Sequence, residues 1–155
     1  MPGTSCRWAI PTTGPPRPVP GARAWEGNSA SLILRLVRNG HGLALFPGDA
    51  DVAALRHLLA SGQEVQADVL LAPHHGSDSS FLPAFLTAVR PRLVVASCGA
   101  FNRFGHPGKR LRQWLEEQRI PLLQTGRHGH VRVTWPLTGH RSGPPAWDTA
   151  RPVRP

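Results

Sequence analysis

Four short runs of apolar residues, separated by segments with helical spacing, restrict the fold of this chain more than any other feature. The runs cover residues 43–46, 67–73, 92–97 and 120–125. The segments between them, 51–62, 80–90 and 107–119, repeat apolar residues at the three- and four-residue spacing of a helix. Short apolar runs are typical of strands that are buried on both faces of a sheet. The alternation therefore predicts an α/β sheet covered by helices.

Two further strands complete the predicted order. Residues 31–38 are strand-like, and Asn39-Gly40 directly after them is the preferred sequence of a two-residue hairpin turn. We expect residues 130–135 to form the last strand and to pair with 120–125 as a closing hairpin. The predicted order is ββαβαβαββ, in the α/β class with the character of an α+β sandwich.

Proline sets the predicted domain boundaries. Many of the 17 prolines lie in residues 1–24 and 137–155, where they oppose both helices and central strands. We therefore expect a folded domain over 25–136 between two disordered segments. No apolar run reaches the ~20 residues of a membrane span, and no apolar stretch of a signal peptide follows Met1. The composition predicts a soluble chain, and its cellular compartment stays open.

Charge and cysteine content narrow the partners only slightly. Lys and Arg number 18 against 9 Asp and Glu, a net charge of +9 that would suit a nucleic acid. However, Lys109 is the only lysine, and such an arginine bias can also follow from the base composition of a genome. Cys6 and Cys98 lack the spacing of a metal site or of a disulfide framework.

Residues that could carry chemistry follow three of the predicted strands. Asp49 comes after the run 43–46, His74 and His75 come after 67–73, and His106 lies beyond 92–97. The loops that follow parallel strands share one rim of the sheet, so we expect these side chains to lie close together. A carboxylate with imidazoles is a ligand set for zinc or manganese. Such an ion can turn a bound water into a nucleophile.

Each of these residues also has a structural interpretation. Asp49 could cap the helix predicted over 51–62, although Asp51 could do so equally well. In an extended chain, adjacent side chains point to opposite sides. We therefore expect one of His74 and His75 to face the site and the other to pack or to form a hydrogen bond.

The later candidates have the same ambiguity. His106 could cap the helix that Pro107 opens, or simply lie in a loop. Ser77 and Ser79 are expected in turns or helix caps rather than as nucleophiles, because no base and acid accompany them. We expect His128 and His130 to be surface residues.

Five stretches together resemble a known family. They are GNSASLILRL, LFPGDAD, ADVLLAPHHGSDSS, RPRLVVASCGAFNRFGHP and LLQTGRHGHVRV, and they span about residues 26–135. In this order they resemble the metallo-β-lactamase-like domain of ComEC-type DNA-internalisation competence proteins. The resemblance implies the second half of a four-layer αβ/βα fold, a site for two zinc or manganese ions, and DNA as the partner. It also implies attachment to a membrane channel protein in the bacterial inner membrane, and hydrolysis of the DNA strand that is not taken up.

The resemblance also implies roles for individual residues. Asp49 stands where the family has its metal-bridging carboxylate, and His74 and His75 stand where a later histidine ligand lies. His75 is favoured because a small residue and Ser follow it. His106 matches a late His-Pro motif and is expected to handle the substrate phosphate or a proton. Further residues are expected to line the substrate site: Asn28, Ser29, Ser77 and Asn102.

One family motif has no counterpart in this sequence. The first metal motif of the superfamily, H-x-[HD]-x-D-H, matches no stretch of the chain. We therefore expect a fragment of a metal-dependent hydrolase that is inactive alone and needs an N-terminal half or a channel protein as its partner. Two alternatives are a free-standing phosphoesterase completed by another chain and a non-catalytic remnant that binds nucleic acid. The last alternative is an unrelated α/β domain without a metal.

Overall fold

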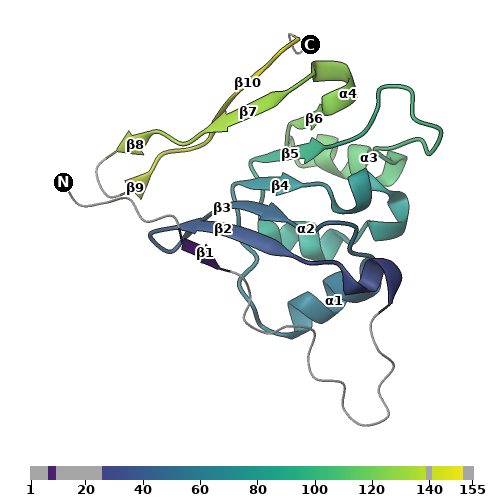
Figure 1. Cartoon of the computed structure of the whole chain (residues 1–155), viewed down its shortest axis with the longest axis horizontal. Coiled ribbons are helices and arrows are strands. Elements are labelled where there is room, and N and C mark those ends of the chain that lie inside the picture. Colours follow the sequence, from purple (N-terminus) through teal and green to yellow (C-terminus); the bar gives the residue numbers. More distant parts are fainter. Residues whose placement is uncertain (1–6, 10–25, 139–140, 152–155) are drawn as a thin grey trace.

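The main sheet contains six strands in the order of the chain. The computed structural model describes residues 7–9, 26–138 and 141–151. The sheet order is β1-β2-β3-β4-β5-β6 (Figure 1). Strands β1 and β2 pair antiparallel, as do β2 and β3, whereas β3 to β6 are parallel. The strands are β1 (Arg7–Ala9), β2 (Leu34–Arg38), β3 (His41–Phe46), β4 (Val69–Leu71), β5 (Leu93–Ala96) and β6 (Leu122–Gln124).

Three helices connect the parallel strands and pack on one face of the sheet. They are α1 (Val52–Ala60), α2 (Pro83–Val89) and α3 (Lys109–Glu117). Crossover connections between parallel strands share one hand, so strands that are added in chain order place all their helices on the same face. None of the helices in the described ranges combines the length and the apolarity that crossing a bilayer requires.

Alternate side chains of the strands feed two separate cores. In β5, Val94 and Ala96 join the helix-side core together with Phe85 of α2, whereas Leu93 and Val95 lie in the core on the opposite face. The opposite face is partly covered by apolar residues from the C-terminal part of the chain, namely Val131, Val133 and Trp135. Burial on both faces explains why the strands are almost continuously apolar. The predicted α/β class with sandwich character is confirmed.

Local turn chemistry follows the sequence closely at two places. Asn39 and Gly40 both have positive φ, 50° and 78°, as a type I′ turn between β2 and β3 requires. Gly62 has a φ of 70° directly after α1, the left-handed position where helices commonly end. The Asn39-Gly40 turn was expected from its residue types alone.

The closing hairpin predicted over 120–135 is wrong. After β6 the chain forms a helical turn, α4 (Thr125–His128), and the amide of Gly126 donates to the carbonyl of Cys98 at 2.9 Å. This bond holds the turn against the segment that follows β5. Strand β7 (Val131–Thr134) therefore leaves the main sheet and pairs antiparallel with β10 (Ala146–Thr149).

The segments expected to be disordered are described only in part. Within 137–155, the chain forms β8 (Leu137–Thr138), β9 (Arg141–Ser142) and β10. The prolines at 144 and 145 do not interrupt these strands, since they lie between β9 and β10. Within 1–24, Arg7–Ala9 forms β1. The remainder of the 1–24 prediction, with Cys6, lies outside the described residues.

A buried carboxylate connects several strands at the end of the sheet where the parallel strands begin. Asp68, just before β4, is only 6% exposed. Its Oδ2 lies 2.8 Å from Nε2 of His41 and accepts from the indole N–H of Trp135 at 3.1 Å, and its Oδ1 lies 3.4 Å from Nε of Arg92. One side chain therefore joins the beginnings of three strands to the C-terminal segment.

We expect Asp68→Ala to destabilise the chain by about 1–3 kcal/mol, because the partly buried indole N–H of Trp135, the ring of His41 and the guanidinium of Arg92 lose their shared partner. Urea unfolding followed by circular dichroism measures the change. Glu117→Ala is the matched control, since it removes an exposed carboxylate and is expected to change stability by less than about 0.5 kcal/mol. Equal stability of the two variants would contradict this role for Asp68.

Candidate functional site

The carboxyl ends of β3, β4 and β5 bring the candidate residues to one rim of the sheet. His75 Nε2 lies 3.5 Å from Oδ1 of Asp49. The ring of His74 lies 6.3 Å from that of His75 and 6.1 Å from that of His106, measured between ring centres. The three loops therefore meet as the strand order predicted. We call Asp49, His74, His75 and His106 the rim cluster.

The competition between two aspartates for the cap of α1 has a clear outcome. Asp51 is the N-cap residue, and its Oδ1 accepts from the amide of Ala54 at 2.9 Å. The hydroxyl of Ser29 donates to its Oδ2 at 2.6 Å. These bonds lower the pKa of Asp51, the bond from Ser29 most of all. Asp49 has no part in the cap, and it faces His75 with half of its side chain exposed.

The two adjacent histidines lie in a tight turn rather than in an extended chain. They belong to the 3-10 turn η2 (Pro73–Gly76), with φ of 48° at His74 and 57° at His75. Gly76 continues the left-handed path with a φ of 87°. The expectation for the two histidines assumed an extended backbone, which this turn does not have. Both rings reach the rim, His75 beside Asp49 and His74 near His106.

This backbone is strained and is held by its neighbours. A left-handed conformation costs a residue other than glycine about 1–2 kcal/mol. The amide of His74 donates to the carbonyl of Gly48 at 2.9 Å, and the amide of Ser77 donates back to the carbonyl of His74 at 3.0 Å. The first bond ties the histidine turn to the loop that carries Asp49. Strain of this kind is concentrated at functional sites.

His106 lies beside the turn and does not cap α3. The N-cap residue of α3 is Gly108, and the amide of Arg110 donates to Oδ1 of Asp78 at 3.2 Å, so a remote carboxylate serves the helix. Burial is the main cause that lowers the pKa of His106, and the nearby His74 and His75 lower it further, whereas Asp78 opposes them. His106 is therefore held as a neutral imidazole at neutral pH, able to accept a proton.

The four residues expected to bind substrate already have partners inside the protein. The amide of Asn28 donates to Nδ1 of His74 at 3.4 Å. The hydroxyl of Ser77 lies 2.8 Å from that of Ser79, in the turn that caps η3 (Asp78–Ser80). Asn102 bonds only to backbone groups, donating to the carbonyl of His106 at 2.7 Å and accepting from its amide at 2.8 Å. Ser29 bonds to Asp51, so three of the four hold the loops of the site in place and Asn28 orients a ring.

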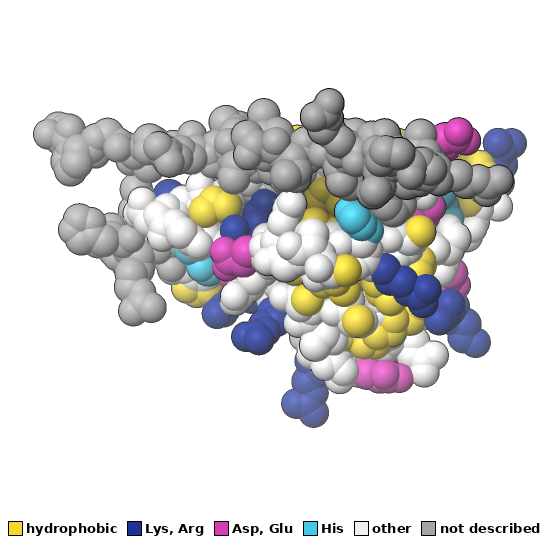
Figure 2. Space-filling view, turned by 90° about the horizontal axis from the view of Figure 1, so that it is seen from below, with side chains coloured by type: hydrophobic (Ala, Val, Ile, Leu, Met, Phe, Trp, Pro, Cys, Tyr) yellow, Lys and Arg dark blue, Asp and Glu magenta, His cyan; other side chains and the backbone are white. Residues whose placement is uncertain are grey.

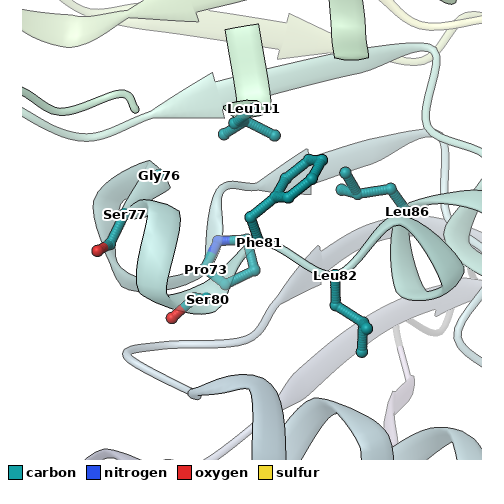
Figure 3. A pocket seen from close by; sticks show the side chains of 8 residues that line it. All are labelled: Pro73, Gly76, Ser77, Ser80, Phe81, Leu82, Leu86 and Leu111. Atoms are coloured by element: carbon teal, nitrogen blue, oxygen red, sulfur yellow. The ribbon is translucent and has the colours of Figure 1, made fainter. Parts of the chain in front are cut away.

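Two hollows lie near the rim cluster and differ in character. Figure 3 shows the first, beneath the histidine turn, lined by Pro73, Phe81, Leu86, Leu111 and their neighbours. Its volume of about 10 Å³ is the room of at most one water, so it is a packing gap. The second is open, polar and about 340 Å³ in volume, and its walls include Asn102, His106, Arg112, Gln124, Arg127 and His128. Only the second has room for a ligand.

The donors in the described part of the chain do not complete a metal site. The 3.5 Å between His75 Nε2 and Asp49 Oδ1 is close to the separation of about 3.3 Å between two ligands of one tetrahedral zinc ion. However, a catalytic zinc takes three protein ligands. Among the described residues, no group of three or more His, Cys, Asp or Glu side chains is placed to hold an ion. Asp49 and His75 can therefore supply two ligands of a metal site, but not a complete ligand set.

On the face that Figure 2 shows, positive charge is not gathered into one patch. In the view from below, Lys and Arg side chains project at several separate places around apolar side chains (Figure 2). The excess of basic residues in the sequence therefore does not by itself mark a binding face on this side.

Three residues at the site have no signal in the sequence. Asp78 serves the beginning of α3, and the amide of Gln124 donates to the carbonyl of Gly99 at 2.9 Å, which holds the loop before His106. The ring of Phe104 stacks on His106 with 5.7 Å between ring centres and 18° between planes. Asp78 and Phe104 are close to His75 and His106 in the sequence, but residue type and spacing do not reveal the contacts that these three residues make.

We expect the stability of the chain to fall more steeply with acidification than that of His106→Gln. Because folding lowers the pKa of His106, the unfolded chain binds a proton first, and stability that is present above pH 6.5 is lost as the pH falls through the pKa of the folded state. Urea unfolding between about pH 7.5 and pH 5 measures the loss. His130→Gln is the control and should follow the parent chain. Parallel curves for the parent and His106→Gln would refute the expectation.

We expect Gly76→Ala to be far more destabilising than Gly105→Ala. Both glycines have positive φ, but a Cβ at Gly105 meets open space, whereas one at Gly76 would lie 2.9 Å from Cβ of Pro107. The strain common to both is about 1–2 kcal/mol, and the overpacking at Gly76 adds about 1–3 kcal/mol. Thermal unfolding of the two variants compares them directly, and equal losses would contradict the close approach.

Comparison with known proteins places this chain beside competence proteins. No protein-family model matches it. It is 35% identical to Competence protein ComA of Neisseria gonorrhoeae over 108 residues, which cover 69% of the chain and 16% of that protein. It is 29% identical to ComE operon protein 3 of Bacillus subtilis over 79% of the chain and 16% of that protein. It is 31% identical to Recombination protein 2 of Haemophilus influenzae over 70% of the chain and 13% of that protein.

The chain thus spans 13–16% of the length of these three relatives. The matches cover more than two thirds of the chain in every case. Two of the three relatives are named for competence or a competence operon. The rim cluster therefore lies in a chain that is related to the ComEC-type competence proteins.

Proposed function

We propose that the rim cluster is one part of a site that hydrolyses phosphodiester bonds of DNA during competence. The observation that carries the proposal is the approach of Asp49 to His75, with His74 and His106 beside them, on a strained turn. The competence relatives supply the context of DNA uptake, and the first metal motif that the resemblance calls for has no match in this sequence. The metallo-β-lactamase-like fold belongs to the same proposal.

The chain contributes an incomplete donor set, so the site needs a second contributor. We propose that donors outside the described residues, from a longer polypeptide or a partner chain, complete it around zinc or manganese. Within the described residues, Asp49 and His75 would be the ligands. The ion would supply a nucleophilic water when bound.

The other two members of the rim cluster, His74 and His106, are each held by an asparagine, and His106 can transfer a proton. Asn28 bonds to Nδ1 of His74 and so fixes the orientation of that ring. Asn102 clamps the backbone of His106 through two hydrogen bonds, while burial keeps the imidazole neutral. A neutral imidazole on a fixed backbone can take a proton from a reacting group, or give it to a leaving oxygen after protonation. This is the proton-transfer role that we propose for His106.

A non-catalytic role in binding nucleic acid is the second candidate. The incomplete donor set favours it, together with the arginines in the wall of the second hollow. It predicts affinity for DNA that falls steeply with salt and is independent of metal.

A graft into a relative tests the enzymatic proposal. Residues 26–135 replace the similar segment of the Neisseria Competence protein ComA, and the purified graft is incubated with labelled DNA and Mn²⁺ or Zn²⁺. Asp49→Ala and His75→Ala in the graft should each slow hydrolysis at least ~100-fold, because loss of a ligand costs more than loss of its outer partner. His130→Gln is the matched control for an exposed histidine.

The comparison with unmodified ComA in the same assay makes the outcome decisive. If the Asp49→Ala and His75→Ala variants of the graft still hydrolyse DNA as fast as the graft itself, the proposed site is wrong. If neither ComA nor the graft cleaves DNA while the 155-residue chain binds it in a salt-dependent, metal-independent manner, the second candidate replaces the first.

A further inference from the structure

The loop between β5 and α3 presents two phenylalanine rings to solvent, and one of them, Phe104, lies against His106 of the rim cluster. Phe101 is fully exposed and Phe104 is 66% exposed, so this one loop carries two exposed large apolar side chains. Exposed aromatic rings contribute little to stability, because they remain in water. The stacking of Phe104 on His106, with Phe101 exposed in the same loop, points to a ligand rather than to folding.

The loop is shaped without the help of these rings. Asn102 donates to the carbonyls of Gly99 and His106 at 2.9 and 2.7 Å, and Gln124 on β6 donates to Gly99 at 2.9 Å. These bonds close the base of the loop from inside. The tip, with Phe101 and Phe104, is therefore held in place while its rings stay uncovered. A loop fixed before binding loses less conformational entropy when it takes a ligand.

A row of flat groups leads from the loop tip to the rim. The guanidinium of Arg103 lies 4.7 Å from the centre of the Phe104 ring. Phe104 stacks on His106, and His106 lies 6.1 Å from His74. Planar π-faced groups with an adjacent cation are the surface on which unpaired nucleobases stack.

The open polar hollow lies directly beside this row. His106 belongs to both, and Arg112 of α3 and Arg127 of α4 stand in the wall of the hollow with exposed side chains. Guanidinium groups bind phosphate oxygens with paired hydrogen bonds. The hollow, at about 340 Å³, has the room and the charge for the sugar-phosphate backbone next to a stacked base.

We propose that Phe101 and Phe104 form a base-stacking element for an unpaired nucleic acid strand, and that Arg112 and Arg127 receive its phosphates in the adjoining hollow. The proposal deepens the proposed function, on which its biological meaning rests. It assigns the loop to substrate positioning and gives the site a preference for unpaired bases. A duplex is a poor ligand here, because its bases already stack on one another and hide their faces.

Fluorescence anisotropy with the full 155-residue chain tests the proposal in EDTA, where a metal-dependent cleavage cannot interfere. The probes are a labelled oligothymidylate of about 12 nucleotides, within the usual site size, an abasic strand of equal length, and a duplex of equal length. We expect the oligothymidylate to bind most tightly. Phe101→Ala and Phe104→Ala should each weaken its binding about 5- to 100-fold and leave the abasic strand and the duplex unchanged.

Further variants separate stacking from charge and from folding. Phe101→Trp should retain binding, since a larger ring still stacks. Arg112→Ala and Arg127→Ala should weaken all three probes and reduce the dependence of affinity on salt. Leu32→Ala removes an equally exposed apolar side chain elsewhere, 66% exposed, and should change nothing. Thermal unfolding establishes that each variant is folded.

Two outcomes would overturn the proposal. One is equal affinity of the parent chain for the oligothymidylate and the abasic strand. The other is unchanged single-strand binding in the folded Phe101→Ala and Phe104→Ala variants, for example if these rings instead hold two copies of the chain together in sedimentation. Because binding is measured without hydrolysis, a failed graft assay with base-dependent binding removes the enzymatic proposal alone.

Discussion

Strands β3, β4, β5 and β6 pair in parallel and in the order in which they occur in the chain, and the positions of all other parts depend on this pairing. Parallel pairing sends every strand out of the sheet at the same end, so the loops that follow β3, β4 and β5 must meet there. The sequential order keeps the three connecting helices on one face. The loops at the rim therefore do not have to cover the opposite face of the sheet. They can carry residues that contribute little to the stability of the sheet.

At that rim, backbone conformation rather than side-chain identity sets the geometry. The left-handed path through His74, His75 and Gly76 turns two consecutive imidazoles toward the same place, which an extended chain cannot do. The amide of His74 donates to the carbonyl of Gly48, the amide of Ser77 donates to the carbonyl of His74, and the amide of Gly108 donates to the carbonyl of Gly76 at 2.8 Å. The turn therefore connects the loop of Asp49 with the beginning of α3. A change in the backbone of any of these three segments affects the other two.

Sequence reasoning succeeds where a local rule decides and fails where a distant contact decides. The Asn39-Gly40 turn, the strands and the meeting of three loops at one rim follow from residue type, periodicity and the geometry of parallel sheets. The choice between Asp49 and Asp51 as a cap does not, because both carboxylates lie within three residues of the first helical residue, and only the folded structure shows that Asp51 accepts from Ala54 and from Ser29. The hairpin after β6 fails because Gly126 bonds to Cys98, a residue 28 positions earlier in the sequence. The role of Asp78 depends on a tertiary contact, its bond with the amide of Arg110.

The carboxylate of Asp68 lies where the parallel strands begin, and the rim cluster lies where they end. Its partners are His41 at the start of β3, Arg92 before β5 and Trp135 beyond β7. The anchoring of the strands and the chemistry of the loops are therefore separated by the length of the sheet. Natural variation can therefore replace residues at the rim without removing the anchor of the sheet, so a chain of this kind can change its rim in evolution and persist as a folded domain.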